Sequence, residues 1–135
     1  MLKKFTFILL LTICYGTSNA QQVVGRKELL SLPLGQHTVD NVQVKEIMFN
    51  PGQRAPRHLH PCPIVGYVAE GSVIYQIEGK PAQTLHQGDA FYEPANTAIA
   101  RFDNASTDKP LKFIAFYLAN GDQPLIQMLP ASDEK

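Results

Sequence analysis

The chain has 135 residues, of which 44% are hydrophobic, and its 12 basic side chains balance its 12 acidic ones. This length and hydrophobic content suit one domain with a packed core and leave no room for a second of ordinary size. The charges form no basic run of the kind that binds nucleic acid, so we expect no nucleic-acid partner.

The first twenty residues have the pattern of a secretion signal. Lys3 and Lys4 precede an apolar run that ends at Cys14, and Ala20 occupies the expected cleavage position. We therefore expect residues 1–20 to be a signal peptide and the mature chain to be exported, either to the periplasm or outside the cell. The apolar run is too short for a stable membrane-spanning helix and no later stretch is a candidate, so we expect no integral membrane anchor after processing.

The rest of the sequence has the pattern of a β protein. Val42, Val44 and Met48 alternate with the residues between them, as in a strand over residues 42–49. Glycines and prolines then bound a series of short apolar runs. We expect further strands at the segment that contains His58 and His60 and at residues 64–68, 72–78, 82–85, 90–93 and 112–118. Their spacing predicts an antiparallel jelly-roll sandwich, followed by a disordered tail at residues 131–135.

Two of the four histidines, His58 and His60, lie one residue apart in a strand-like context. Residues two apart in a strand point to the same side, so both imidazoles face one place. Imidazole is the commonest protein ligand of transition metals, and two converging rings make half of a typical divalent site. The spacing therefore indicates a metal site, with an unliganded surface pair as the alternative.

These histidines belong to a longer pattern in two parts. Five residues separate Gly52 from His58-Leu59-His60, and the first part closes at Gly71. The second part runs over residues 88–94 and is followed by Asn104. This pattern resembles the two-part signature of the cupin superfamily. The resemblance implies an all-β fold, a cupin-type jelly-roll β-barrel or sandwich, over residues 21–130.

The resemblance also implies functional properties. Metal-binding cupins hold a divalent transition metal, here zinc, iron, copper or manganese, and catalyse dioxygenase, isomerase or lyase reactions on small organic substrates. Cupins commonly pair through sheet edges, which implies a homodimer, and an apolar strand at residues 113–118 would support it if that strand lies at an edge.

The sequence departs from the family pattern at two ligand positions. Ile64 and Val65 stand where the first part usually has a glutamate, and Ile99 stands where the second part usually has a histidine. Two histidines with water would bind a metal weakly, so another side chain must contribute. The isoleucines also make the pocket drier, which favours an apolar or aromatic ligand over a sugar.

Cys62 is the nearest candidate for a third ligand, because it shares strand parity with His58 and His60. A thiolate would favour zinc, copper or iron. Pro61 and Pro63 flank it, however, and proline in a strand often marks an edge or a bulge. The alternatives are an ordinary buried thiol and a reactive thiol in the pocket.

Glu93, late in a predicted strand, is a candidate inward carboxylate that completes the metal site or binds ligand. The alternative is an ion pair with Arg57 or Arg101 across the sheet. Tyrosines combine an apolar ring with a hydroxyl and suit a pocket that orients a small molecule. Their alternative role is packing in the core. With Glu93, the candidate ligand-binding residues are Tyr67, Tyr75 and Tyr92, and Tyr117 has the same chemistry.

Two functions are consistent with these residues. One is a metal-dependent cupin in which His58 and His60 hold the ion and Cys62 or Glu93 completes the site. The other is a metal-free, non-catalytic barrel that binds a small molecule, with the two histidines as polar pocket residues.

Overall fold

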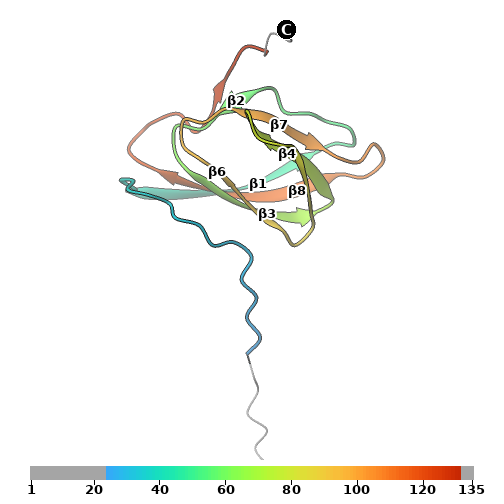
Figure 1. Ribbon diagram of the computed structural model, residues 1–135, viewed down its shortest axis with the longest axis horizontal. Coiled ribbons are helices and arrows are strands. Elements are labelled where there is room, and N and C mark those ends of the chain that lie inside the picture. The colour runs from blue at the N-terminus through green and yellow to red at the C-terminus, as the bar shows by residue number, and fades with distance from the viewer. Residues whose placement is uncertain (1–23, 132–135) are drawn as a thin grey trace, which may run out of the picture.

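The computed structural model describes residues 24–131, in which the chain forms nine β-strands and no helix. Residues 24–40 run as an irregular segment along which most side chains are exposed, and they lead away from the body of the molecule (Figure 1). The expected signal peptide at residues 1–20 lies outside the described residues. The described residues include no helix long and apolar enough to cross a membrane. The strands are β1 (Asn41–Phe49), β2 (His58–Leu59), β3 (Ile64–Glu70), β4 (Ser72–Ile77), β5 (Gln83–His86), β6 (Ala90–Glu93), β7 (Ile99–Asn104), β8 (Leu111–Ala119) and β9 (Gln127–Met128).

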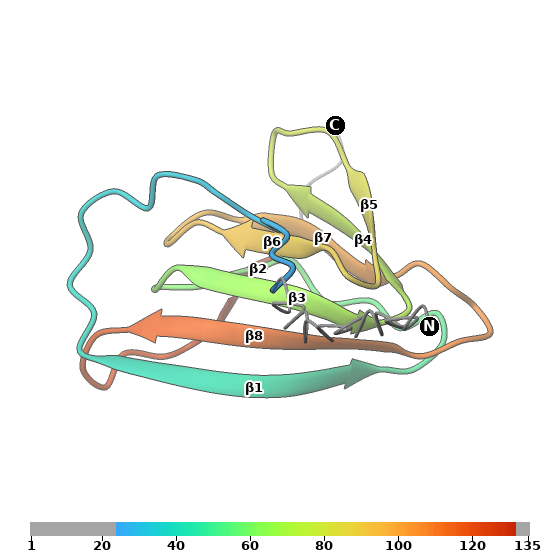
Figure 2. The same ribbon diagram turned by 90° about the horizontal axis from the view of Figure 1, so that it is seen from below.

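The strands form two sheets that face each other (Figures 1 and 2). One sheet has the order β1-β8-β3-β6 and the other the order β5-β4-β7-β2-β9. All the strand pairs are antiparallel. The two sheets are not joined into one closed sheet, so the fold is a sandwich. This confirms the predicted all-β jelly roll.

The core lies between the sheets because each long strand alternates buried and more exposed residues. In β8, every second residue from Leu111 to Ala119 is buried. Val68 of β3 and Val73 of β4 are completely buried. Each fully buried aliphatic or aromatic side chain stabilises the fold by roughly 1.5–3 kcal/mol relative to exposure. The alternation thus fixes which side chains point inward, and the same rule applies to the strands that carry the candidate site.

A glycine in β3 shapes the inner surface. Gly66 lies directly opposite Phe91 of β6. A Cβ atom at position 66 would collide with the phenyl ring of Phe91. The missing side chain therefore lets this ring lie across β3 and form part of the wall of the inner cavity.

Two strands were not among those predicted from the sequence. Polar residues interrupt the apolar alternation of β7, Ile99–Asn104, and β9 has only two residues. Strand β8 lies between β1 and β3. The apolar strand predicted at residues 112–118 is therefore an inner strand of its sheet, and β1 is the edge.

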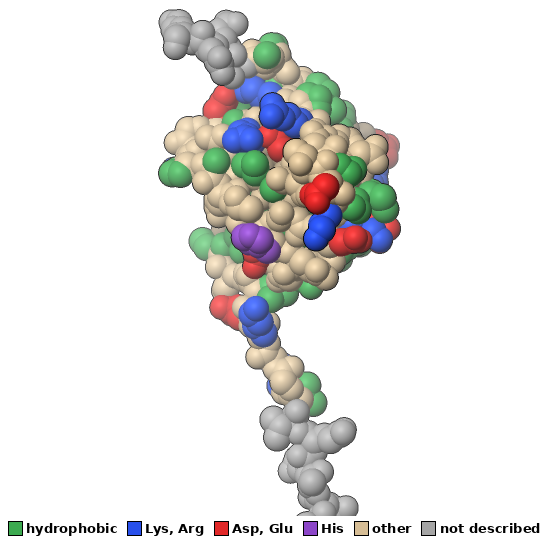
Figure 3. Space-filling model, turned by 90° about the vertical axis from the view of Figure 1, so that its right-hand side faces the viewer, with side chains coloured by type: hydrophobic (Ala, Val, Ile, Leu, Met, Phe, Trp, Pro, Cys, Tyr) green, Lys and Arg blue, Asp and Glu red, His purple; other side chains and the backbone are tan. Residues whose placement is uncertain are grey.

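Charged side chains of both signs are mixed on the face of the molecule in Figure 3. On this face, Lys and Arg lie beside Asp and Glu among the residues drawn in colour. Arg57 and Glu78 form an ion pair at the surface of the molecule, with 2.7 Å between Nη2 and Oε2. This face therefore presents no extended area of a single charge.

Candidate metal centre

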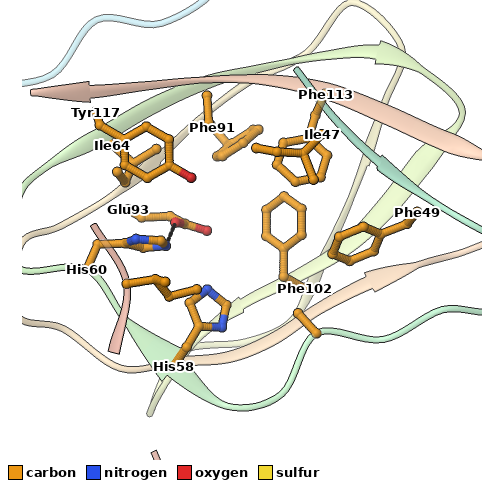
Figure 4. Close-up of a pocket in the computed structure, with 13 residues that line it drawn as sticks. Ile47, Phe49, His58, His60, Ile64, Phe91, Glu93, Phe102, Phe113 and Tyr117 are labelled. Atoms are coloured by element: carbon orange, nitrogen blue, oxygen red, sulfur yellow. Dashed lines mark ion pairs between the residues drawn. The ribbon is translucent and has the colours of Figure 1, made fainter. Parts of the chain in front are cut away.

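Three buried side chains converge between the sheets (Figure 4). His58 begins β2, His60 directly follows it, and Glu93 ends β6. One donor atom from each lies within 4.8 Å of the others. Each of these residues is at most 5% exposed. Two imidazole nitrogens and a carboxylate oxygen form a donor set that suits a divalent transition metal.

Backbone carbonyl groups orient both histidines. His58 Nδ1 lies 2.7 Å from the Pro56 carbonyl oxygen, and His60 Nδ1 lies 2.5 Å from that of Leu125. A carbonyl oxygen only accepts, so each Nδ1 carries the proton and donates it. This fixes the tautomer in which Nε2 is available, and such an outer hydrogen bond is usual for a metal-ligating histidine.

The second histidine already contacts the carboxylate. His60 Nε2 lies 2.9 Å from Glu93 Oε2. Burial lowers the pKa of His60, but the hydrogen bond and the negative charge of Glu93, together with the Leu125 carbonyl, outweigh it, so the pKa is raised from its ordinary value. Without a metal, a proton between Nε2 and Oε2 links the two side chains, and a metal ion would replace it.

The strand register explains how the site departs from the family pattern. Ile64, at the position where the resemblance leads one to expect a carboxylate, is directly opposite Glu93 in the β3–β6 pair. Directly opposite residues share one face of a sheet. Glu93 thus places a carboxylate beside Ile64 from the neighbouring strand. Ile99, at the position of the expected third imidazole, is opposite His58 in the β2–β7 pair.

The other proposed metal ligand lies apart from this cluster. Cys62 is 1% exposed and belongs to the hydrophobic core, but it is not among the converging donors. β2 ends at Leu59, and the prolines on both sides of Cys62 place it in a bend where strand parity does not hold. Burial raises the pKa of its thiol, which disfavours the thiolate form that binds metals.

The C-terminal segment closes one side of the site. Besides the Leu125 carbonyl that holds His60, β9 pairs with β2 through His58 and Leu59. The amide of Leu129 donates to the Arg57 carbonyl at 2.9 Å. The pattern of side chains along the sequence does not predict where these backbone groups lie, so the sequence did not indicate a role for Leu125.

A cavity of about 240 Å³ adjoins the donor cluster. Its polar side chains, the three donors and the Tyr117 hydroxyl, lie at one end, whereas phenylalanines fill the other (Figure 4). The Tyr117 ring packs edge-on against His60, with 5.7 Å between centroids. Burial, followed by the charge of Glu93, raises the pKa of the Tyr117 hydroxyl, so it stays protonated and can donate. The lining residues are Ile47, Phe49, Ala55, His58, His60, Ile64, Phe91, Glu93, Phe102, Phe113, Ala115, Tyr117 and Ile126.

The other predicted ligand-binding tyrosines lie elsewhere. Tyr67 is on the outer side of β3 and is 36% exposed. Tyr75 is buried, and its hydroxyl donates to the backbone carbonyl of Tyr92. Tyr75 and Tyr92 line a second, smaller hollow beside Leu30. The structure thus brings Glu93 to the histidines but does not bring these three tyrosines to the same cavity.

The fold and the site define a small jelly-roll protein with a buried donor cluster at one end of an apolar cavity. A family profile described as the cupin domain matches residues 45–117, more than half of the chain. A cupin-like protein from Thermotoga maritima is 32% identical, with a TM-score of 0.59 and coverage of 70% of this chain and 68% of its own. The chain belongs to the cupin family.

Two further solved structures resemble this chain at lower identity. A DMSP lyase from Ruegeria pomeroyi is 18% identical, with a TM-score of 0.60 and coverage of 70% of this chain and 46% of its own. A polyketide cyclase from Streptomyces resistomycificus is also 18% identical, with a TM-score of 0.56 and coverage of 68% and 63%. At these identities the likeness shows the fold alone, and this chain spans less than two thirds of either protein. The comparison with curated proteins found no match.

Proposed function

We propose that this protein is an exported cupin that binds a divalent transition metal through His58, His60 and Glu93, and that it holds a small organic ligand in the adjoining cavity. The observation that carries the proposal is the convergence of three buried donor atoms within 4.8 Å at the end of an apolar pocket. Charged groups are rarely buried unless they are paired or ligate a metal.

The residues present fit such an ion. Each histidine offers Nε2, since its Nδ1 is committed to a backbone carbonyl, and Glu93 offers a carboxylate oxygen. Three protein donors leave room for a ligand, as in catalytic rather than structural sites. A bound divalent ion supplies Lewis acidity toward a ligand oxygen. Tyr117 lies where its hydroxyl can donate to a group bound beside Glu93.

Metal content tests this proposal directly. We expect about one transition-metal ion per chain when the protein is purified without chelators and analysed by elemental mass spectrometry. The His58→Ala/His60→Ala variant should lose the ion. His86→Ala is the matched control, because the His86 side chain is 71% exposed and lies outside the cluster. Equal metal content in wild type and the double variant would contradict the proposed site.

Export is the part of the proposal that rests on the sequence pattern of residues 1–20. Mass spectrometry of the protein recovered from fractionated cells measures its N-terminus. A chain that begins at Gln21 in the periplasm or the medium supports export. A chain that retains residues 1–20 in the cytoplasm contradicts it.

A metal-free binding barrel is the second candidate function, and one observation favours it. The His60–Glu93 pair satisfies both side chains without an ion, and among residues 24–131 no buried side-chain nitrogen or oxygen atom lacks a hydrogen-bond partner. The cavity then binds its ligand through apolar contacts and the Tyr117 hydroxyl. Absence of metal in both proteins of the experiment above would select this function.

We also propose that the protein forms a homodimer through the outer face of the four-stranded sheet. Val42, Val44 and Met48 of edge strand β1 are each more than half exposed, and Phe116 lies directly opposite Val44. An exposed apolar patch of this kind is typical of a protein contact. Sedimentation analysis should show a dimer that Val44→Glu weakens. Val24→Glu, at a 70% exposed position outside this face, should leave it intact. A monomeric wild type would overturn the proposal.

A further inference from the structure

The inner cavity divides into two chemically different ends. The donor cluster and Tyr117 lie at one end, and the rings of Phe49, Phe91, Phe102 and Phe113 lie at the other (Figure 4). No lysine or arginine is among the lining residues. A second negative charge on a ligand would therefore be buried without a partner, which costs several kcal/mol.

The size of the cavity limits the ligand. Its volume of about 240 Å³ exceeds that of an engineered cavity of about 150 Å³ that holds one benzene molecule. One six-membered ring with a short substituent fills this space.

The phenylalanines select for an aromatic ring. Phe102 and Phe113 lie 4.8 Å apart between centroids, Phe91 and Phe102 lie 5.2 Å apart, and the rings are tilted or edge-on to each other. A ring that enters beside them gains edge and face contacts worth about 0.5–1.5 kcal/mol beyond burial of its surface. A saturated ring of the same size gains burial but lacks these contacts.

We infer that the ligand of this cavity is a single aromatic ring that carries one or two oxygen donors and at most one negative charge. The oxygen faces His58, His60 and Glu93, and the ring lies against the phenylalanines. The part of this inference that concerns the oxygen rests on the proposed metal site. The part that concerns the ring rests on the cavity alone. Ile126, which lines the cavity and is 43% exposed, marks where the cavity wall reaches the surface.

Binding to the full chain loaded with Co²⁺ tests the inference. The probes are benzyl alcohol and its saturated counterpart cyclohexylmethanol, which both carry one primary hydroxyl group, together with xylose and succinate. Calorimetry gives each Kd, and the visible absorption of Co²⁺ reports whether an oxygen reaches the ion. We expect the aromatic probe to bind about two- to tenfold more tightly than the saturated one. We expect xylose and succinate to bind at least about tenfold more weakly than the aromatic probe.

A pair of variants separates the ring contacts from general effects on the fold. Phe49→Leu removes a partly buried ring from the cavity wall and should reduce the preference for the aromatic probe. Phe116→Leu makes the same change on the outer face, where the side chain is 37% exposed, and should leave the preference unchanged.

The outcomes separate this inference from the proposed function. If Co²⁺ is retained but xylose or succinate binds as tightly as the aromatic probe, or no probe binds, the inference fails and the metal site stands. If Co²⁺ is not retained, the metal site fails, and the two ring probes are compared on the metal-free protein. A preference for the aromatic probe there supports the ring assignment, and equal or absent binding overturns it.

Discussion

Glu93 and Ile64 lie directly opposite each other on β6 and β3, and both line the inner cavity. Opposite residues in an antiparallel pair share a face and have Cβ atoms about 5 Å apart. The carboxylate can therefore move from one strand to the next and still reach the same two histidines. The protein belongs to its family by fold, and in the proposed metal site a neighbouring strand supplies one ligand.

This relationship predicts that the two residues can be exchanged. Glu93→Ile alone should remove the bound metal, whereas the double variant Ile64→Glu/Glu93→Ile should restore it, because the carboxylate returns from the facing position. Elemental analysis of the purified variants is the measurement. Glu46→Ile, at an exposed position of the outer face, is the control that should keep its metal. Metal loss in the exchanged variant would show that the strand of origin matters.

A third imidazole can be added opposite His58. Ile99→His should tighten zinc binding by at least about tenfold, because a further donor joins the site from the facing residue of β7. The metal-free variant should unfold more easily, by about 1–3 kcal/mol, since a buried apolar side chain becomes polar. Competition with a chromophoric chelator measures the affinity. The control is Ile74→His, outside the cavity, which should not alter the affinity for zinc. An unaltered affinity in Ile99→His would contradict the prediction that positions 58 and 99 share one face of the sheet.

The pH dependence of the metal-free protein follows from His60. Its pKa is raised in the folded state above its unfolded value of about 6.5, so protonation favours the folded state. This stabilisation is complete below about pH 6.5 and is lost as the pH rises through the folded-state pKa. Denaturant unfolding at pH values from below about 6.5 to above the folded-state pKa should show this loss of stability in wild type and not in Glu93→Gln. A difference between the two proteins that grows with pH would contradict the assignment.

Metal binding should respond to pH in the opposite direction. The ion and the proton compete for Nε2 of His60, so the affinity for zinc should fall as the pH drops through the raised pKa. Titration of zinc at several pH values, with His86→Ala as a control that retains the site, measures this dependence. An affinity that does not change over the range would show that His60 is not a ligand.

Gly66 should tolerate no side chain. Gly66→Ala places a methyl group against the Phe91 ring and should destabilise the fold by about 1–3 kcal/mol or more, because the ring must leave its position in the cavity wall. Gly25→Ala, where a Cβ meets nothing within 4 Å, is the control. Thermal unfolding is the measurement. Adding Phe91→Leu to Gly66→Ala should recover part of the loss, and failure to do so would place the strain elsewhere.

The sequence predicted the fold and the two histidines because both depend on local periodicity. Alternation along residues 42–49 matches β1, and the spacing of His58 and His60 puts both rings on the inner side. The partner of the histidines depends on which strand pairs with β3 and in what register, and periodicity does not carry that information. Glu93 was therefore one candidate among several before the structure joined it to His60.

Two other features lay beyond the sequence pattern for different reasons. The prolines around Cys62 interrupt the strand, so counting residues from His60 no longer gives its direction. Asn104 ends β7 and donates its amide to the carbonyls of Asn50 and Lys109. In the sequence, nothing distinguishes an asparagine that hydrogen-bonds the backbone of two other segments from any other asparagine.

The hydrogen bond from His60 to the Leu125 carbonyl spans 65 residues. During synthesis, the histidines leave the ribosome long before the group that sets the tautomer of His60. Most of both sheets can form in that interval, whereas the donor cluster is complete only when residues 125–128 have emerged and paired with β2. An ion captured earlier would meet an incompletely oriented site. Completion of the proposed metal site is therefore a late event in the synthesis of the chain.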